Sequence, residues 1–319
     1  MIAETKTGKP PMKEVLTVAL LLAMSVALPW ARGADSPLEP KVKSEQEGSG
    51  MGMELDVNYG FAAGSKTHTG STDLGHVSEQ NAGLKCVVSP ELSKNLLLRV
   101  GVEWDRFSFG LPSGAPLPNT LQQVSAIFGF DCQIDDHWLL RMELQPGLYS
   151  DFKDLTFRDV NAPVLLGASY LVDANLQWFL GLRVDLRSRY WIVPAAGVRW
   201  KFADEWTLNM LFPQPRLEYD LNKQCQLYFG ARMLSGTFRL ADDFGNTHAV
   251  MGPRANNTTL DFFEVRVGPG VVWKILPNLI LEAEAGCMVH REFEFDDPYT
   301  VVRSNNPAPY GQLSLHTSF

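Results

Sequence analysis

Long hydrophobic runs are nearly missing from this sequence. Beyond the N-terminus, no stretch approaches the roughly 20 apolar residues that a helix needs to cross a bilayer, although 45% of all residues are hydrophobic. Mean hydropathy is close to zero, which is too polar for a bundle of membrane helices. The composition suits either a soluble β-sandwich or a barrel whose alternate residues face lipid and water.

An excess of positive charge is missing as well. The chain has 28 Lys and Arg against 36 Asp and Glu, and this net charge of −8 gives no electrostatic basis for binding nucleic acid. The six histidines are dispersed, and neither an HExxH nor a GxSxG motif occurs. We therefore predict no catalytic residues, no metal site and no cofactor.

The N-terminus carries the one extended apolar segment. Three lysines precede the largely apolar residues Val15–Leu28, and Ala31-Arg32-Gly33 follows as a small-residue cleavage site. This order is typical of a secretory signal peptide, and the segment is short for a spanning helix. We predict a signal peptide over residues 1–33, with Met12 as an alternative start. Residues 34–50, rich in Pro, Ser, Glu and Gly, are predicted to be a disordered periplasmic linker.

Cysteine is scarce, with four residues in the whole chain. In an exported protein, four cysteines can form two disulfides. However, Cys86, Cys132, Cys225 and Cys287 are each in phase with the apolar residues of an alternating segment. A thiol on an apolar face behaves as a small hydrophobic group, so we predict four free thiols on the outward face.

From residue 51 to residue 319 the chain alternates apolar and polar residues with a period of two. Between residues 95 and 108, for example, Leu, Val and Trp alternate with Arg99, Glu103 and Asp105. This period predicts strands with one apolar and one polar face. The predicted strands cover residues 52–63, 76–89, 95–108, 121–134, 138–150, 161–172, 176–188, 191–202, 206–212, 215–221, 225–239, 259–275, 279–295 and 308–319.

The connections between these strands are short polar turns at one end and longer linkers at the other. This asymmetry and the even number of strands predict an all-β, membrane-spanning, antiparallel up-and-down β-barrel of fourteen strands. The alternative is twelve strands, because segments 206–212 and 215–221 are shorter than the roughly 9–11 residues of a spanning strand. The short turns are expected to be periplasmic. The expected extracellular loops include Ser65–Gly75, Gly110–Thr120, Asp151–Val160, Ala241–Thr258 and Asp296–Pro307.

Aromatic residues gather near the ends of the predicted strands. Interfacial girdles of a membrane barrel lie at this level, whereas the aromatic residues of a soluble sandwich would also occupy strand middles. The pattern therefore favours the barrel. The residues are Trp104, Trp138, Tyr190, Trp191, Trp200, Trp206 and Trp273.

The last strand carries the most specific pattern. Leu313, Leu315, Thr317 and Phe319 are in phase, and Phe319 is the final residue. This resembles the C-terminal signature that bacterial outer-membrane proteins present to their barrel-assembly machinery. The whole mature chain looks like an uncharacterised, porin-like outer-membrane β-barrel family. The resemblance implies a location in the bacterial outer membrane, contact with its lipid, and Phe319 as the assembly signal.

Projecting the alternation inward places two groups of charges in the lumen. Facing walls of opposite charge would set a transverse field across a pore and select polar solutes. The alternative is a lumen filled by neutralising ion pairs. The predicted basic wall consists of Arg183, Arg187, Arg199, Lys201, Arg216 and Arg232, and the predicted acidic wall of Glu54, Asp56, Glu282 and Glu284.

These features predict a narrow passive channel for small polar or charged solutes. Fourteen strands lie between eight, which fill their interior with side chains, and sixteen, which leave a channel. The first alternative is a non-conducting structural or surface-adhesion barrel that acts through its extracellular loops. The second is an outer-membrane lipase-like enzyme.

Overall fold

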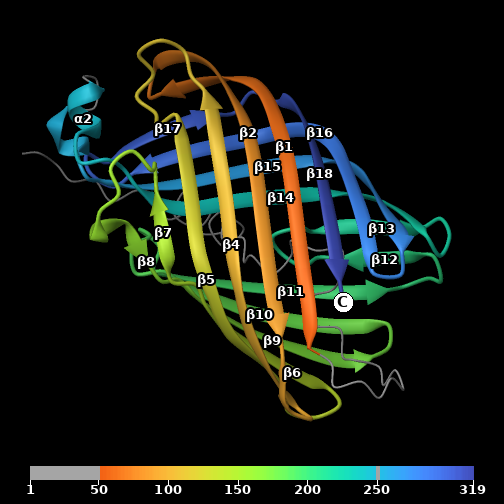
Figure 1. Cartoon of the computed structure of the whole chain (residues 1–319). Helices are drawn as coiled ribbons and strands as arrows, with labels where there is room; N and C mark the ends of the chain where they lie inside the picture. The colour runs from red at the N-terminus through yellow and green to blue at the C-terminus, as the bar shows by residue number, and fades with distance from the viewer. Residues whose placement is uncertain (1–50, 249–251) are drawn as a thin grey trace, which may run out of the picture.

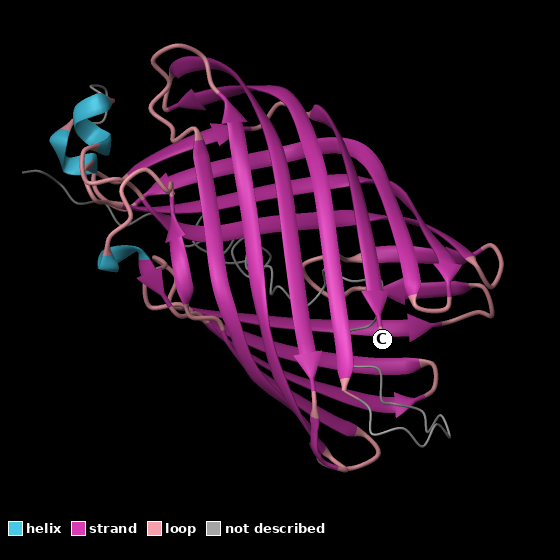
Figure 2. Cartoon of the chain, viewed as in Figure 1, coloured by secondary structure: helices cyan, strands magenta, loops and turns pink. Residues whose placement is uncertain are grey.

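A computed structural model describes residues 51–248 and 252–319, and nearly all of its regular structure is strand (Figures 1 and 2). The predicted signal peptide and periplasmic linker lie outside the described residues. Three short helical turns occur in the described parts of the chain: η2 (Phe157–Asp159), α2 (Phe244–Thr247) and η3 (Pro253–Ala255). No helix in these ranges is long and apolar enough to cross a membrane.

The strands form one sheet in which neighbours along the chain pair antiparallel, with one parallel pairing between strands distant in the sequence. Their bounds are β1 Gly52–Thr69, β2 Thr72–Ser89, β3 Glu91–Ser93, β4 Leu96–Gly110, β5 Thr120–Gln133, β6 Trp138–Leu144, β7 Gly147–Ser150, β8 Val160–Asn161, β9 Val164–Asp173, β10 Leu176–Val184, β11 Ile192–Lys201, β12 Trp206–Asn209, β13 Arg216–Asp220, β14 Cys225–Arg239, β15 Thr259–Leu276, β16 Leu279–Phe295, β17 Thr300–Ser304 and β18 Ala308–Ser318.

The sheet closes into a barrel of fourteen strands, as predicted. The pairs β2 and β3, β6 and β7, β8 and β9, and β17 and β18 are each one interrupted strand, because both members of a pair lie against the same neighbouring strand. Closure joins β1 to β18. Met53 and Phe319 exchange both backbone hydrogen bonds, at 3.0 and 2.9 Å. The alternative of twelve strands is therefore wrong.

The barrel exposes apolar side chains and buries charged ones. On β4, Val100 and Val102 are 38% and 55% exposed, whereas Arg99 and Glu103 on either side of them are 2% and 1% exposed. A soluble protein shows the opposite distribution, and an apolar band of this kind requires hydrocarbon around it. The alternation therefore defines a membrane-spanning barrel with a polar interior.

An aromatic girdle surrounds the end with the short turns. Trp138 and Tyr170 lie with ring centroids 4.9 Å apart, and Trp206 and Tyr219 are also 4.9 Å apart. Trp200 joins the same belt beside Leu176 and Leu208 on the neighbouring strands. Trp104, by contrast, lies in the interior of β4. Tyr190 and Trp191 follow the end of β10.

Several predicted boundaries were wrong for identifiable reasons. Ser65–Gly75, predicted as a loop, is mostly strand, because β1 and β2 continue to a tight turn at Gly70, where φ is +55°. A Lys66–Asp73 ion pair of 2.9 Å joins the two strands there. The predicted loop Asp296–Pro307 contains β17, and predicted strand 176–188 ends at Val184.

The hairpin of β12 and β13 is shorter than segments 206–212 and 215–221. β12 ends at Asn209 and β13 begins at Arg216. Pro213 and Pro215 between them have no N–H to donate to a ladder. The strand count is nevertheless fourteen, since both short strands pair with their neighbours.

The four cysteines have free thiols, as predicted. Cys287 is exposed on β16, and Cys86, Cys132 and Cys225 are half-buried at outward positions of their strands. In nanodiscs, we expect a charged, water-soluble maleimide to label these thiols roughly tenfold more slowly than a lipid-soluble one, because they face hydrocarbon. An Asp204→Cys variant in an exposed turn serves as the control and should react with both reagents. Equal rates for both reagents at the four native thiols would contradict the assignment of the lipid face.

Candidate functional site

The barrel narrows at the end with the long loops because β7 meets β14. Ser150 and Arg239 pair there, and the Asp151 N–H donates to the Arg239 carbonyl at 3.1 Å. Burial raises the pKa of the Asp151 carboxyl, which accepts a hydrogen bond from the Ala241 N–H at 3.1 Å. Nine strands then form a smaller ring: β1, β2, β4, β5, β7, β14, β15, β16 and β17. A barrel of about eight strands has an interior that is filled by side chains.

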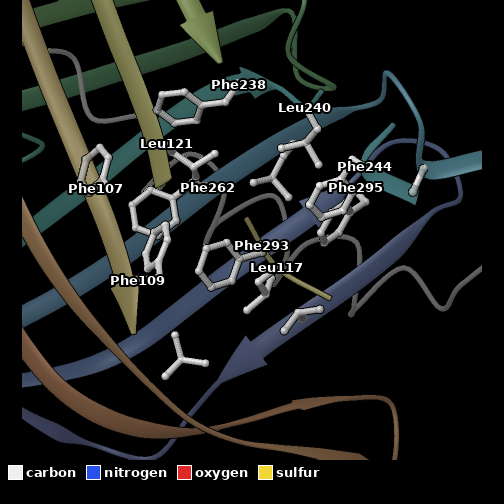
Figure 3. Close-up of a cluster of buried hydrophobic side chains, with 14 of the residues drawn as sticks. Phe107, Phe109, Leu117, Leu121, Phe238, Leu240, Phe244, Phe262, Phe293 and Phe295 are labelled. Atoms are coloured by element: carbon white, nitrogen blue, oxygen red, sulfur yellow. The ribbon is translucent and has the colours of Figure 1, made fainter. Parts of the chain in front are cut away.

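Apolar side chains fill this narrow half, as Figure 3 shows. Phe262 has ring centroids of Phe107, Phe109 and Phe293 at 4.9, 5.7 and 5.4 Å. We call the set the apolar plug, and each of its members is at most 6% exposed. It consists of Val77, Phe107, Phe109, Leu117, Leu121, Tyr149, Leu234, Phe238, Leu240, Phe244, Ala255, Leu260, Phe262, Phe293, Phe295 and Val302.

A closed ring of four charges lies at the next inward positions on β2, β15 and β16. Arg266 contacts Glu79 and Glu264 at 2.8 and 2.5 Å, and Arg291 contacts the same two residues at 2.8 and 2.5 Å. Each of the four is at most 1% exposed. We call them the charged ring. Two cations balance two anions, and their mutual attraction offsets the cost of removing the four charges from water.

A β-bulge explains why the sequence did not reveal Arg291. The register between β15 and β16 shifts, so that Val265 pairs with His290 but Arg266 pairs with Met288. The alternation on β16 is inverted beyond this point. Arg291 therefore faces the lumen, whereas His290 and Glu292, which an unbroken alternation along β16 would turn inward, point outward. Glu79 was in phase with Lys85 and could have been found from the sequence.

The wide half of the lumen holds two further ion-pair networks. Arg232 contacts Glu282 at 2.8 Å and Glu284 at 2.9 Å, and the Tyr228 hydroxyl oxygen lies 2.7 and 2.9 Å from the same two carboxylates. Arg216 lies 3.7 Å from Glu282. Two members of the predicted basic wall are thus in contact with two members of the predicted acidic wall.

The second ion-pair network contains one further residue of the predicted acidic wall, Glu54. Arg99 makes two hydrogen bonds of 3.0 Å to Glu54. Its neighbours Asp131 and Glu143 lie 3.7 and 3.6 Å away. Asp56 contacts His316.

The remaining basic residues are spread over one side of the barrel. Arg183 contacts Asp185 at 2.7 Å. Arg187 lies beyond the end of β10 and donates to a loop carbonyl, and Arg199 and Lys201 occupy inward positions near the short-turn end of β11. The structure therefore does not gather the predicted basic wall into one surface, and a pore-lining role for these residues stays a prediction.

A small polar cavity lies in the wide half between β1, β14, β16 and β18. Its volume is ≈ 20 Å³, which is room for about one water molecule. It is lined by polar side chains that include Asp56, Asn58, Gln214, Gln312 and His316. Among the described residues, no group of three or more His, Cys, Asp or Glu side chains is placed to hold a metal ion.

Fold and interior together define a class: a membrane-spanning β-barrel of fourteen strands whose lumen is closed by stacked layers of charged and apolar side chains. Residues 94–301 match the model of the DUF6268 family, described as a domain of unknown function. The match covers more than half of the chain, and the chain belongs to this family. No curated protein sequence matches it.

Comparison with solved structures finds outer-membrane barrels at low identity. The COG4313 outer membrane channel from Pseudomonas putida F1 is 11% identical, with a TM-score of 0.45 over 88% of this chain and 100% of that one. The NanC porin is 10% identical, with a TM-score of 0.38 over 82% and 98%. The toluene transporter TodX from Pseudomonas putida is 10% identical, with a TM-score of 0.38 over 84% and 88%.

Proposed function

We propose that this protein is a porin-like outer-membrane channel for small polar or charged solutes, and that the conformation described is its closed state. The observation that supports a polar solute is the chemistry of the wide half, where Glu54, Arg99, Arg232, Glu282 and Glu284 face the lumen. Charged lumen linings favour hydrated ions and polar molecules.

Opening requires movement of side chains or strands. The charged ring has an exposure of at most 1%, and the apolar plug lies beyond it in the narrow half. A solute therefore cannot pass along the barrel axis in this conformation. The proposed channel is gated, in contrast to the passive channel that the composition and strand count suggested.

Planar-bilayer recording of the refolded protein tests the proposal. We expect rare, discrete openings of the unmodified protein. Reversing two inward charges near the short-turn mouth, Arg199→Glu with Lys201→Glu, should change the cation-to-anion permeability ratio by about twofold or more, because fixed charges in a narrow pore set ion selectivity. The measurement is the reversal potential in a KCl gradient.

The matched control is Lys223→Glu with Lys94→Glu, which makes the same charge change in exposed short turns. This variant should leave the permeability ratio unchanged. If the two variants had the same cation-to-anion permeability ratio, Arg199 and Lys201 would not line the conduction path. Absence of any discrete conductance in folded protein would contradict the channel.

A non-conducting barrel is the second candidate, and the charged ring is the observation that favours it. A neutral ring of buried ion pairs beneath an apolar plug also describes a lumen that serves only to fill a wide barrel. In that case the protein acts through its lipid-facing surface and long loops. Conductance recording separates the two candidates.

A further inference from the structure

The barrel wall has a seam between β11 and β14. β11 pairs with the short β12 only up to residue 198, and β14 pairs with β13 up to Gly230. Two further hydrogen bonds follow on β14, from the Ala231 N–H to the Pro215 carbonyl at 2.9 Å and from the Met233 N–H to the Pro213 carbonyl at 3.0 Å. Beyond these points, residues 192–197 and 234–238 have no ladder partner on their facing edges within the described parts of the chain. No backbone ladder therefore joins the two sides of the wall here.

The segment that follows β10, residues 185–191, covers this seam from outside. The Arg189 N–H donates to Asp261 Oδ2 at 3.2 Å, and its guanidinium lies 3.3 Å from Glu294 and 3.9 Å from Asp296. It also lies 4.2 Å from the ring centroid of Tyr299. Asp261 and Glu294 face outward, because their neighbours on β15 and β16 belong to the apolar plug. Residues 185–191 thus overlap the outer face of β14–β16.

Burial on β14 supports this overlap. Met233 and Thr237 occupy outward positions, yet they are only 6% and 4% exposed. Phe229, at an outward position nearer the short turns, is 59% exposed. The outer part of β14 is therefore covered by protein, whereas its other part faces lipid.

The two ends of residues 185–191 are held differently. The buried Asp185 carboxylate accepts a hydrogen bond from Asn161 Nδ2 at 2.9 Å. Arg189 is 39% exposed, and its pair with Asp296, which is 64% exposed, contributes about 0–1 kcal/mol, whereas its other partner Glu294 is 10% exposed.

Inside the seam, Leu211 packs closely against Gly197 and lies in a buried apolar cluster with Leu165 and Phe179, so opening the seam must also displace Leu211. Arg183 and Asp185 supply polar groups at the end of β10.

We propose that residues 185–191 form a releasable latch, and that release of Arg189 opens the seam between β11 and β14 as a side entrance for polar solutes. This entrance reaches the lumen beside β9–β11 without crossing the apolar plug. The solute class rests on the proposed function. The movement of the wall does not.

A thiol placed under the latch tests the movement directly. Ser235 lies at an outward position of β14, and its hydroxyl is buried with no hydrogen-bond partner among the described residues. Ser235→Cys therefore removes no contact, and it is made in a chain whose four native cysteines are replaced by Ser. Arg189→Glu should increase labelling of this thiol by a charged maleimide about tenfold, since a local opening controls access.

The matched control is Arg303→Glu. Arg303 is an arginine of the same rim, 2.9 Å from Glu292, but its pair joins β16 to β17, which share a ladder. Labelling in this variant should stay at the rate of the parent, and Arg189→Lys should also keep the slow rate. If Arg189→Glu fails to fold, Asp296→Lys with Glu294→Gln removes the acceptors instead and should accelerate labelling.

The outcomes separate the latch from the channel. Equal labelling rates with Arg189→Glu and Arg303→Glu, or fast labelling in the parent, would overturn the latch. Fast labelling only after latch release, in protein that never conducts, would support the moving seam and contradict the channel.

Discussion

Arg291→Met is expected to lower the free energy of unfolding by about 3–5 kcal/mol, which is the usual effect of removing one member of a buried ion pair. Arg291 contacts Glu79 and Glu264 inside the barrel, and all three side chains are almost completely buried. Without Arg291, two carboxylates share a single cation. The measurement is urea unfolding in lipid vesicles, followed by tryptophan fluorescence and by the mobility of the folded form in gels.

A compensating variant distinguishes this cause from a general packing defect. Arg291→Met with Glu264→Gln leaves Arg266 paired with Glu79 at 2.8 Å and restores neutrality, so it should recover most of the lost stability. Arg303→Met, which breaks an exposed pair, should have an effect of about 1 kcal/mol or less. A double variant as unstable as Arg291→Met would show that charge balance is not the cause.

Phe262→Ala is expected to destabilise the barrel by about 3–5 kcal/mol, the range for a buried Phe that leaves a cavity. Phe262 is 1% exposed at the centre of the apolar plug and contacts Phe107, Phe109 and Phe293. The remaining rings cannot close the space without moving strands. The same unfolding assay in vesicles measures the effect.

Phe229→Ala provides a control of the same chemistry on the neighbouring strand. Phe229 takes an outward position on β14 and is 59% exposed, so its removal leaves lipid in contact with the strand and creates no internal cavity. We expect a clearly smaller loss of stability than for Phe262→Ala. Equal losses would mean that the plug is not packed as described, because inward and outward positions would then be equivalent.

The fold could be predicted from the sequence to the level of strands, their number and their inward faces. The reason is that lipid forces a strict period of two on each spanning strand, as Val100 and Val102 against Arg99 and Glu103 illustrate. Errors arose where polar residues continued a strand beyond the membrane, as near Lys66. No hydrophobic signal marks such extensions.

The side-chain contacts inside the lumen could be predicted less well from the sequence. Projection found Arg216, Arg232, Glu282 and Glu284 as inward residues, but not that they contact each other, because contact across a lumen depends on how far the barrel is open. The contact of β7 with β14 narrows the lumen, and no local sequence pattern encodes the pairing between Ser150 and Arg239. The bulge before Arg291 inverted the phase without a proline or glycine at the inserted position.

The contact between β7 and β14 also bears on how the chain folds. Hairpins between neighbouring strands form from short segments, whereas Ser150 and Arg239 meet only after the chain between them has been ordered. Joining β1 to β18 likewise requires the two ends of the chain to come together. The polypeptide must therefore complete two ring closures of high contact order, and such long-range pairings slow folding. A chain that joins β1 to β18 without joining β7 to β14 retains an open strand edge and is kinetically trapped. Assembly of this barrel therefore has a rate-limiting step that a simple cylindrical barrel lacks.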